Sequence, residues 1–344
     1  MAQLGQMGVQ RLLLVTDPYF MENGTAKQLA ALSGASETAF FDKVTPDPTV
    51  ELAAEGTALV RSFRPDTVAA LGGGSAMDCA KAMVYFADRP VRLVMVPTTS
   101  GSGSEVTDFA VLTHKGVKHP LVDEKLRPAA AILDSDLLRS LPKALIADTG
   151  FDVLSHALEA WVAKGATPFT DALAKDAFSA AFSLLPASYG GNVDVRLRVH
   201  QAATMAGMAF TQAGLGLCHA MAHALGGAFH LPHGRLNAIL LPAVVSANAD
   251  AAKEKYAAVA RAAGIGSSAD TMAVRSLRSG LIRLRRQLKM PQTLAQAGID
   301  LTLLQRKKEQ ILQAALEDPC CKTNPAPVSR RLLEQVLDEV TGFA

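Results

Sequence analysis

Features that mark several large protein classes are missing from this chain of 344 residues. No stretch approaches the roughly 20 uninterrupted apolar residues that a membrane helix needs, which argues against a membrane protein. The four cysteines lack the spacing of a disulfide framework, and a net charge of +2 is too balanced for a nucleic-acid-binding surface. The first residues contain a short apolar run but no basic segment followed by a cleavage site. We therefore expect a reduced, cytoplasmic protein without a secretory leader.

Catalytic motifs of common enzyme classes are missing as well. The chain has no H-E-x-x-H, which excludes the usual zinc-protease pattern, and no G-x-S-x-G nucleophile elbow. It also has no internal repeat. Apolar residues are plentiful, at 49% hydrophobic against 19% charged, so a large core can be buried and disorder is not expected. The length favours two domains.

The sequence changes character near residue 141. Before it, short β-branched runs alternate with helical stretches, which predicts a parallel sheet covered by helices. After it, a region rich in Ala, Leu and Met with helical periodicity continues to the end. We predict an α/β domain over 1–141 and an all-helical domain over 142–344. In the first domain we expect strands at 11–17, 67–75 and 91–105, each of the last two running into a loop, and helices at 25–34, 49–63 and 76–87.

Two polar loops follow neighbouring predicted strands. Gly72-Gly73-Gly74-Ser75 follows one, without the G-x-G-x-x-G spacing, and the run 97–105 follows the next. Open parallel sheets bind ligands at the carboxyl ends of their strands, so these loops predict a nucleotide site; a tight strand-to-helix turn is the alternative. Asp17 closes the first strand, where a carboxylate accepts from a ribose hydroxyl and repels a 2′-phosphate. That favours NAD over NADP, with a turn or helix-capping role as the alternative.

Histidines are concentrated in one segment of the second domain. Half of the eight lie within fifteen residues, and these are His219, His223, His230 and His233. Upstream, Asp152 and His156 are four residues apart on a predicted helix and therefore share a face. Imidazole is a common metal ligand and also titrates near neutral pH, so the pattern favours a metal or acid–base site. The spacing alone leaves open which side chains bind and what they bind.

The chain resembles the iron-dependent, or group III, alcohol dehydrogenases. The resemblance covers nearly the whole chain and is carried, in the family's order and separations, by LGGGSAMDCAKA, VPTTSGSGSEVT, GFDVLSHALEAWV and GLCHAMAHALGGAFHLPHGRLNAILLP. Three shorter segments are most similar to the ethanol- and 1-propanol-type members, namely FDVLSHALEA, PASYGGN and DPCCKTNP. The resemblance implies a dehydroquinate synthase-like fold, with a Rossmann-like parallel-sheet domain followed by an all-α domain.

The resemblance also implies a role for each candidate residue. In the family one Asp and three His hold the metal, and the matching positions are Asp152, His156, His219 and His233. His223 matches the histidine beside the nicotinamide that relays protons, whereas His230 has no counterpart and is assigned a structural or rim position. Positions that match the NAD(H) site are Asp17, Gly72, Gly73, Gly74, Ser75, Asp78, Thr98, Thr99, Ser102 and Lys118. Positions that match the pocket wall are Phe109, Phe210 and Cys320.

These roles imply a metal-dependent oxidoreductase that transfers a hydride between NAD(H) and a short-chain primary alcohol or aldehyde, working mainly as an aldehyde reductase. The metal is expected to be Fe²⁺, with Zn²⁺ as the substitute, acting as a Lewis acid in a cleft between the domains. The alternatives are a polyol or hydroxy-acid dehydrogenase (glycerol, 1,2-propanediol, lactaldehyde or 4-hydroxybutyrate type) and an inactive metal-binding component of an enzyme compartment.

The expected partners are a small alcohol or aldehyde and further copies of the chain, without nucleic acid or membrane. An aldehyde-producing enzyme or a bacterial microcompartment is a further expected association. One departure concerns assembly. Family members carry a longer segment before the first strand, with an edge strand that often helps to form the dimer. Here that strand begins at residue 11, so the family's usual dimer contact is not expected.

Overall fold

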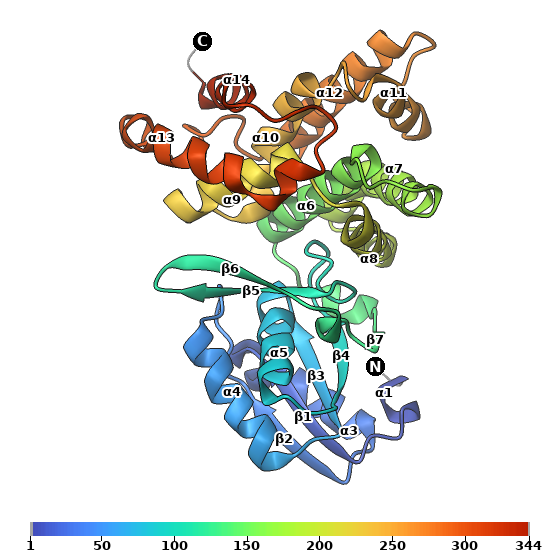
Figure 1. Ribbon diagram of the computed structural model, residues 1–344. Helices are drawn as coiled ribbons and strands as arrows, with labels where there is room; N and C mark the ends of the chain where they lie inside the picture. Colours follow the sequence, from blue (N-terminus) through green and yellow to red (C-terminus); the bar gives the residue numbers. More distant parts are fainter. Residues whose placement is uncertain (1–2, 343–344) are drawn as a thin grey trace. The chain divides into compact units, whose positions relative to one another are not determined.

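The computed structural model describes residues 3–342 and divides into two compact units between Ser140 and Leu141 (Figure 1). The division predicted from the sequence is one residue later, between residues 141 and 142. The first unit contains a parallel sheet with the strand order β2-β1-β3-β4-β7. Its strands are β1 (Arg11–Thr16), β2 (Glu37–Phe41), β3 (Thr67–Gly72), β4 (Arg92–Pro97) and β7 (Ala130–Ala131). Its helices are α1 (Gln3–Gln6), α2 (Pro18–Glu22), α3 (Thr25–Ser33), α4 (Val50–Phe63), α5 (Gly74–Ala87), and the 3₁₀ turns η1 (Glu124–Leu126) and η2 (Ser135–Leu138).

Both faces of the sheet are covered, which explains why its strands are apolar without alternation. Side chains on one face of the sheet, such as those of Leu13, Val68 and Met95, pack with α4 and α5. Side chains on the other face, such as those of Leu12 and Val94, pack with α1, α3 and η2. Figure 1 shows α4 and α5 together on one side of the sheet.

A hairpin that the sequence analysis missed follows β4. It consists of the antiparallel strands β5 (Phe109–His114) and β6 (Val117–Val122), with the turn at Lys115-Gly116. Residues of β6 are mostly exposed, so the strand lacks the buried apolar run by which the other strands are recognised. It is outside the main sheet.

Strand order reverses between β1 and β3. The chain passes from β1 to β2 on one side, and β3 then pairs with β1 on the other. In an open parallel sheet the loops beyond the carboxyl ends of two such strands diverge and leave room for a ligand. Here those ends carry Asp17 and the glycines after Leu71.

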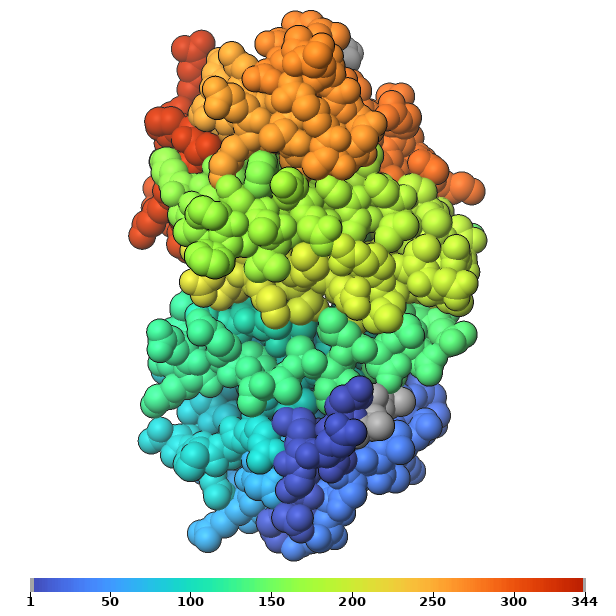
Figure 2. Space-filling view, turned by 90° about the vertical axis from the view of Figure 1, so that its right-hand side faces the viewer, coloured from blue at the N-terminus to red at the C-terminus, as the bar shows by residue number. Residues whose placement is uncertain are grey.

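The described residues of the second unit contain helices and no strand. These are α6 (Lys143–Val162), α7 (Pro168–Gly190), α8 (Arg196–Ala213), α9 (Leu217–Phe229), α10 (His233–Ala247), α11 (Lys253–Ala262), α12 (Asp270–Gln287), α13 (Leu301–Glu317), the turn η3 (Pro319–Lys322) and α14 (Arg330–Thr341). Figure 2 shows α11 and α12, in orange, at one end of this unit against the green α7, in agreement with the contacts among these three helices.

Helix α6 is the centre of the second unit. Nearly all of its side chains from Ile146 onward are buried, and it contacts α7, α8, α9 and α10. A helix that is buried all round can carry polar residues only where they have partners. Its acidic residues and its histidine are therefore candidates for a site. Within residues 3–342, no helix is long and apolar enough to cross a membrane.

Candidate metal centre and nucleotide loops

The two polar loops lie side by side at the carboxyl ends of β3 and β4. Gly72 is level with Pro97 in the sheet, and the Thr98 N–H donates to the Gly72 carbonyl at 2.9 Å. A Cβ added at Gly73 would lie 3.2 Å from Thr99 Oγ1, and one at Gly74 would lie 3.3 Å from Ser102 Oγ. The glycines thus let the loops approach each other, and Ser75 follows in the first turn of α5.

Asp17 lies at the adjacent strand end. Its Oδ1 accepts a hydrogen bond from the Phe20 N–H and so caps α2, as the alternative interpretation proposed. Its Oδ2 faces the glycine loop, 4.0 Å from a Cβ built on Gly72. Lys118 is on β6, in an exposed ion pair with Asp47 at 2.7 Å.

Asp78 supports the loop that follows β4. One oxygen accepts from Ser104 Oγ at 2.6 Å and the other from the Val111 N–H at 3.0 Å. With both oxygens engaged by protein donors, the carboxylate joins α5, the 97–105 loop and β5. This geometry favours a supporting role over the direct cofactor contact that the resemblance implies.

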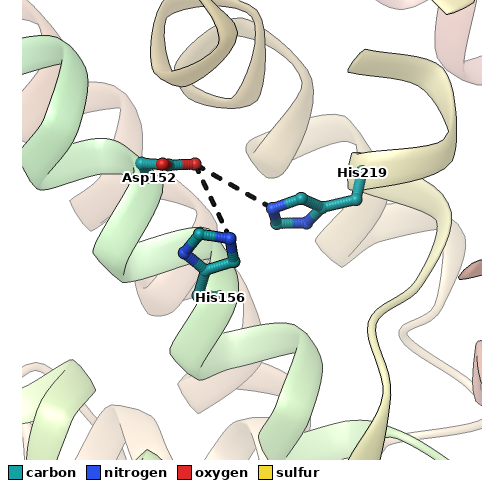
Figure 3. A group of neighbouring side chains, drawn as sticks. All are labelled: Asp152, His156 and His219. Atoms are coloured by element: carbon teal, nitrogen blue, oxygen red, sulfur yellow. Dashed lines mark ion pairs between the residues drawn. The ribbon is translucent and has the colours of Figure 1, made fainter. Parts of the chain in front are cut away.

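In the second unit, the Asp152 carboxylate lies close to three imidazole rings. Asp152 and His156 come from successive turns of α6, and His219 comes from the first turn of α9 (Figure 3). The Asp152 Oδ1 lies 3.9 Å from His156 Nε2 and 3.9 Å from His219 Nε2. It lies 3.6 Å from Nε2 of His233, the first residue of α10.

Charge and burial keep these groups in the protonation states that a metal requires. Burial lowers the pKa of His219 and of His233 well below the usual value, so both imidazoles are neutral and offer a lone pair. Burial acts to raise the pKa of Asp152, but His156 and the hydrogen bond from Asn237 outweigh it and hold this pKa below its usual value. The cluster thus places an ionised carboxylate beside the neutral imidazoles of His219 and His233.

Two side chains that were not predicted from the sequence form hydrogen bonds to members of this cluster. Glu159 is buried and accepts from His219 Nδ1 at 2.7 Å and from the backbone N–H groups of Gly216, Cys218 and His219. Burial raises the pKa of Glu159 to about 7, although the three N–H groups favour its ionised form. Asn237, one turn after His233, donates from Nδ2 to Asp152 Oδ1 at 2.9 Å.

The other two histidines of the segment lie in different surroundings. The ring of His223 stacks on that of His233, with centroids 5.2 Å apart, and its Nδ1 lies 2.8 Å from Asp318 Oδ2. The carboxylate that holds His223 was not predicted. His230 ends α9 in a left-handed conformation, with φ of 55°, and is exposed. Among the described residues, neither group of three or more potential metal ligands includes His230.

Two family models match most of the chain. One described as iron-containing alcohol dehydrogenase matches residues 1–135, and one described as the C-terminal part of the Fe-containing alcohol dehydrogenase family matches residues 146–341. The chain belongs to the iron-containing alcohol dehydrogenase family. The predicted family and the predicted enzyme class are thereby confirmed.

Named relatives of this alcohol dehydrogenase agree with the assignment. It is 41% identical over 322 residues to 1-propanol dehydrogenase PduQ of Salmonella typhimurium, covering 90% of this chain and 87% of the relative. It is 36% identical over 323 residues to an NADPH-dependent butanol dehydrogenase of Clostridium saccharobutylicum, covering 88% and 83%. The iron-containing alcohol dehydrogenase structure from Thermococcus thioreducens matches with a TM-score of 0.92 and 33% identity, over 99% of this chain and 96% of that one. The predicted Rossmann-like domain followed by a helical domain is thus confirmed.

The three predicted pocket residues of the dehydrogenase occupy different positions. Phe210 on α8 is buried and stacks on His156, with centroids 4.4 Å apart. Cys320 is in η3, where burial and the nearby Asp318 raise the pKa of its thiol, so it is protonated at rest. Phe109 begins β5 in the first unit. Phe210 and Cys320 therefore lie near the histidine cluster.

Gly234 sets the spacing between α10 and α6, and we expect Gly234→Ala to destabilise the protein. A Cβ there would lie 1.9 Å from the backbone carbonyl oxygen of Asp148, which cannot move away cheaply. Overpacking of this kind costs about 1–3 kcal/mol. Gly227 on α9 is the matched control, since nothing lies within 4 Å of its Cβ position and alanine at an exposed helical site stabilises by about 0.5–1 kcal/mol. The melting temperature should fall for the first variant and rise slightly for the second; equal shifts would contradict the packing argument.

Proposed function

We propose that this alcohol dehydrogenase is an NAD(H)-linked enzyme that reduces short-chain primary aldehydes at a metal held by Asp152, His156, His219 and His233. The observation that carries the proposal is that one ionised carboxylate lies 3.6 to 3.9 Å from three imidazole Nε2 atoms in the second unit. Ionised oxygen and neutral nitrogen donors without a thiolate suit Fe²⁺ and also Zn²⁺.

The spacing between Asp152 Oδ1 and the three imidazole Nε2 atoms suits such an ion. Metal–ligand bonds of about 2.1 Å in a tetrahedral arrangement separate neighbouring ligand atoms by about 3.4 Å. The three distances from Asp152 Oδ1 to the Nε2 atoms are 3.6 to 3.9 Å, close to that separation. When bound, the metal supplies a Lewis acid that polarises the oxygen of the alcohol or aldehyde.

His223 has the surroundings of a proton relay. Its Nδ1 faces the Asp318 carboxylate, which favours the tautomer with hydrogen on Nδ1 and leaves Nε2 free to exchange a proton. Its side chain is 46% exposed, so water reaches it.

The loops of the first unit support nicotinamide nucleotide binding. Backbone N–H groups at Gly73, Gly74 and the start of α5 are suited to a pyrophosphate. Thr98, Thr99 and Ser102 add hydroxyls at the next strand end. Asp17 beside Gly72 supports NAD(H) over NADP(H), in contrast to the cofactor named for the butanol dehydrogenase relative.

We expect Asp17→Asn to shift this preference. Asparagine caps a helix as well as aspartate does, so α2 should persist, while the charge that repels a 2′-phosphate is lost. The ratio of kcat/KM for NADH to that for NADPH should fall by about tenfold or more, equivalent to about 1.4 kcal/mol. Initial rates with the two cofactors measure it. An unchanged ratio would leave Asp17 with its capping role alone.

The decisive assay follows NADH absorbance in anaerobic mixtures of the Fe²⁺-loaded enzyme and propionaldehyde. We expect turnover with short apolar aldehydes, and its loss in air over time with recovery on adding Fe²⁺. His223→Gln should lower kcat by about 10²–10⁴-fold while the iron content stays unchanged. No turnover with any short aldehyde would reject the proposal. Faster turnover with lactaldehyde or glycerol would favour the polyol-type alternative.

A further inference from the structure

A second cluster of metal-ligating side chains adjoins the first and contains a thiol. It consists of His223 on α9 and of Asp318 and Cys320 at the start of η3, and we name it the sulfur cluster. One potential ligand atom from each of the three lies within 4.8 Å of the other two. His223 Nδ1 and Asp318 Oδ2 are in hydrogen-bond contact, 2.8 Å apart.

Local backbone structure holds this arrangement together. The Asp318 Oδ1 accepts from the backbone N–H of Cys320 at 2.8 Å, which caps the turn. Helix α9 contacts both η3 and α13. The ring of His223 stacks on that of His233, so the sulfur cluster lies beside the proposed iron ligands without sharing a side chain with them.

We propose that the sulfur cluster binds a thiophilic divalent cation, Zn²⁺ in particular. Imidazole, carboxylate and thiolate are the three kinds of zinc ligand found in proteins, and three of them with an open position form a typical exchangeable site. Thiolate is a soft ligand that suits Zn²⁺, whereas Mg²⁺ and Ca²⁺ prefer oxygen ligands. On binding, the S–H bond of Cys320 breaks, a metal–sulfur bond forms, and the proton passes to solvent.

Occupation of the sulfur cluster excludes the hydrogen bond between His223 and Asp318. Both groups would then be metal ligands, so the imidazole would no longer have its Nδ1 proton and its carboxylate partner. Zinc at this site is therefore an inhibitor that acts beside the iron without displacing it. This consequence rests on the proposed role of His223, whereas cation binding itself does not.

The neighbouring cysteine provides a matched control. Cys321 has its Sγ 3.0 Å from the Ala315 carbonyl oxygen and is not among the residues of the sulfur cluster. The two thiols differ by one position in the chain. Cys320→Ser and Cys321→Ser thus remove the same atom, inside the cluster and outside it.

The test adds Co²⁺ to the anaerobic, Fe²⁺-loaded enzyme and records the near-ultraviolet thiolate-to-cobalt charge-transfer band. The proposed iron ligands include no sulfur, so cobalt that exchanges into their site gives no such band. We expect the band to saturate in the wild-type protein and in Cys321→Ser, and to be absent in Cys320→Ser. Absence in the wild type, or persistence in Cys320→Ser, would overturn the proposal.

Zinc titration separates the two proposals. Added Zn²⁺ should displace the bound Co²⁺, bleaching the band while the iron content is unchanged, and Cys320→Ser should weaken zinc binding by at least about tenfold. Asp318→Asn should weaken it as well. Loss of iron in step with zinc uptake would show that zinc binds at the Asp152 site, and it would overturn the proposal that the sulfur cluster binds zinc. If the protein shows the cobalt band but reduces no aldehyde, the proposed cation site stands and the proposed function is rejected.

Discussion

Replacing His233 by alanine should remove iron from the purified enzyme, whereas replacing His230 by glycine should leave the iron content unchanged. His233 contributes the Nε2 atom closest to Asp152 Oδ1, at 3.6 Å. Loss of that ligand leaves three donors, and we expect metal affinity to fall by at least about 100-fold, since loss of an outer partner alone costs up to that much. Aldehyde reduction should fall with it.

His230 is the matched control, because it is a neighbouring histidine of the same segment. It occupies the left-handed position that ends α9, which glycine adopts without strain, so the substitution removes an imidazole and preserves the turn. Iron per chain, measured after anaerobic reconstitution and desalting, decides the outcome. Retained iron in the His233 variant, or lost iron in the His230 variant, would reverse the two roles.

The nucleotide loops were predictable because their signal is local. A buried strand, glycines and a helix follow one another in the chain at 67–87, and hydroxyls follow the next strand. The carboxyl ends of adjacent parallel strands lie at one edge of a sheet, so the proximity of Gly72 to Pro97 follows from chain order alone. The hairpin at 109–122 was missed because its exposed, mixed residues give no apolar run.

The pairing of Asp152 with His156 was also visible, since four residues on a helix place both on one face. Glu159 lies on the same face one turn further along, at a position that the same periodicity marks. It was overlooked because its partners, from Gly216 to His219, are nearly sixty residues away. An acidic residue one turn after His156, flanked by apolar residues of α6, is the signal that would have found it.

Asn237 and Asp318 give weaker signals. Each acts on a histidine or carboxylate through tertiary contacts, and an isolated Asn or Asp in a helical region is otherwise a surface or capping residue. The resemblance to the family supplied the metal and cofactor positions that periodicity left open. It did not supply the hydrogen bonds that hold those positions, which depend on how α6, α9, α10 and η3 pack.

Glu159→Gln should weaken metal binding by about 10–100-fold although the residue is not itself a ligand. When ionised, the Glu159 carboxylate has only acceptors, and four groups face it: three backbone N–H groups and His219 Nδ1. Glutamine has one oxygen and one NH₂ group, so a donor must face a donor in either orientation. A buried group left without a partner in this way costs about 1–3 kcal/mol, which should also lower the melting temperature.

The two orientations of the glutamine have different consequences for His219. With the oxygen toward Nδ1, the tautomer is kept, but the NH₂ group meets the Cys218 N–H and the start of α9 must shift. With the NH₂ group toward Nδ1, that nitrogen must accept, so the hydrogen moves to Nε2 and the lone pair for the metal is lost. Glu254→Gln, at an exposed position on α11, removes the same charge without either effect. Anaerobic Fe²⁺ titration of both variants separates the outcomes: a lower melting temperature with undiminished iron affinity would make Glu159 a residue of the core alone, whereas weakened affinity makes it the residue that sets the tautomer of His219.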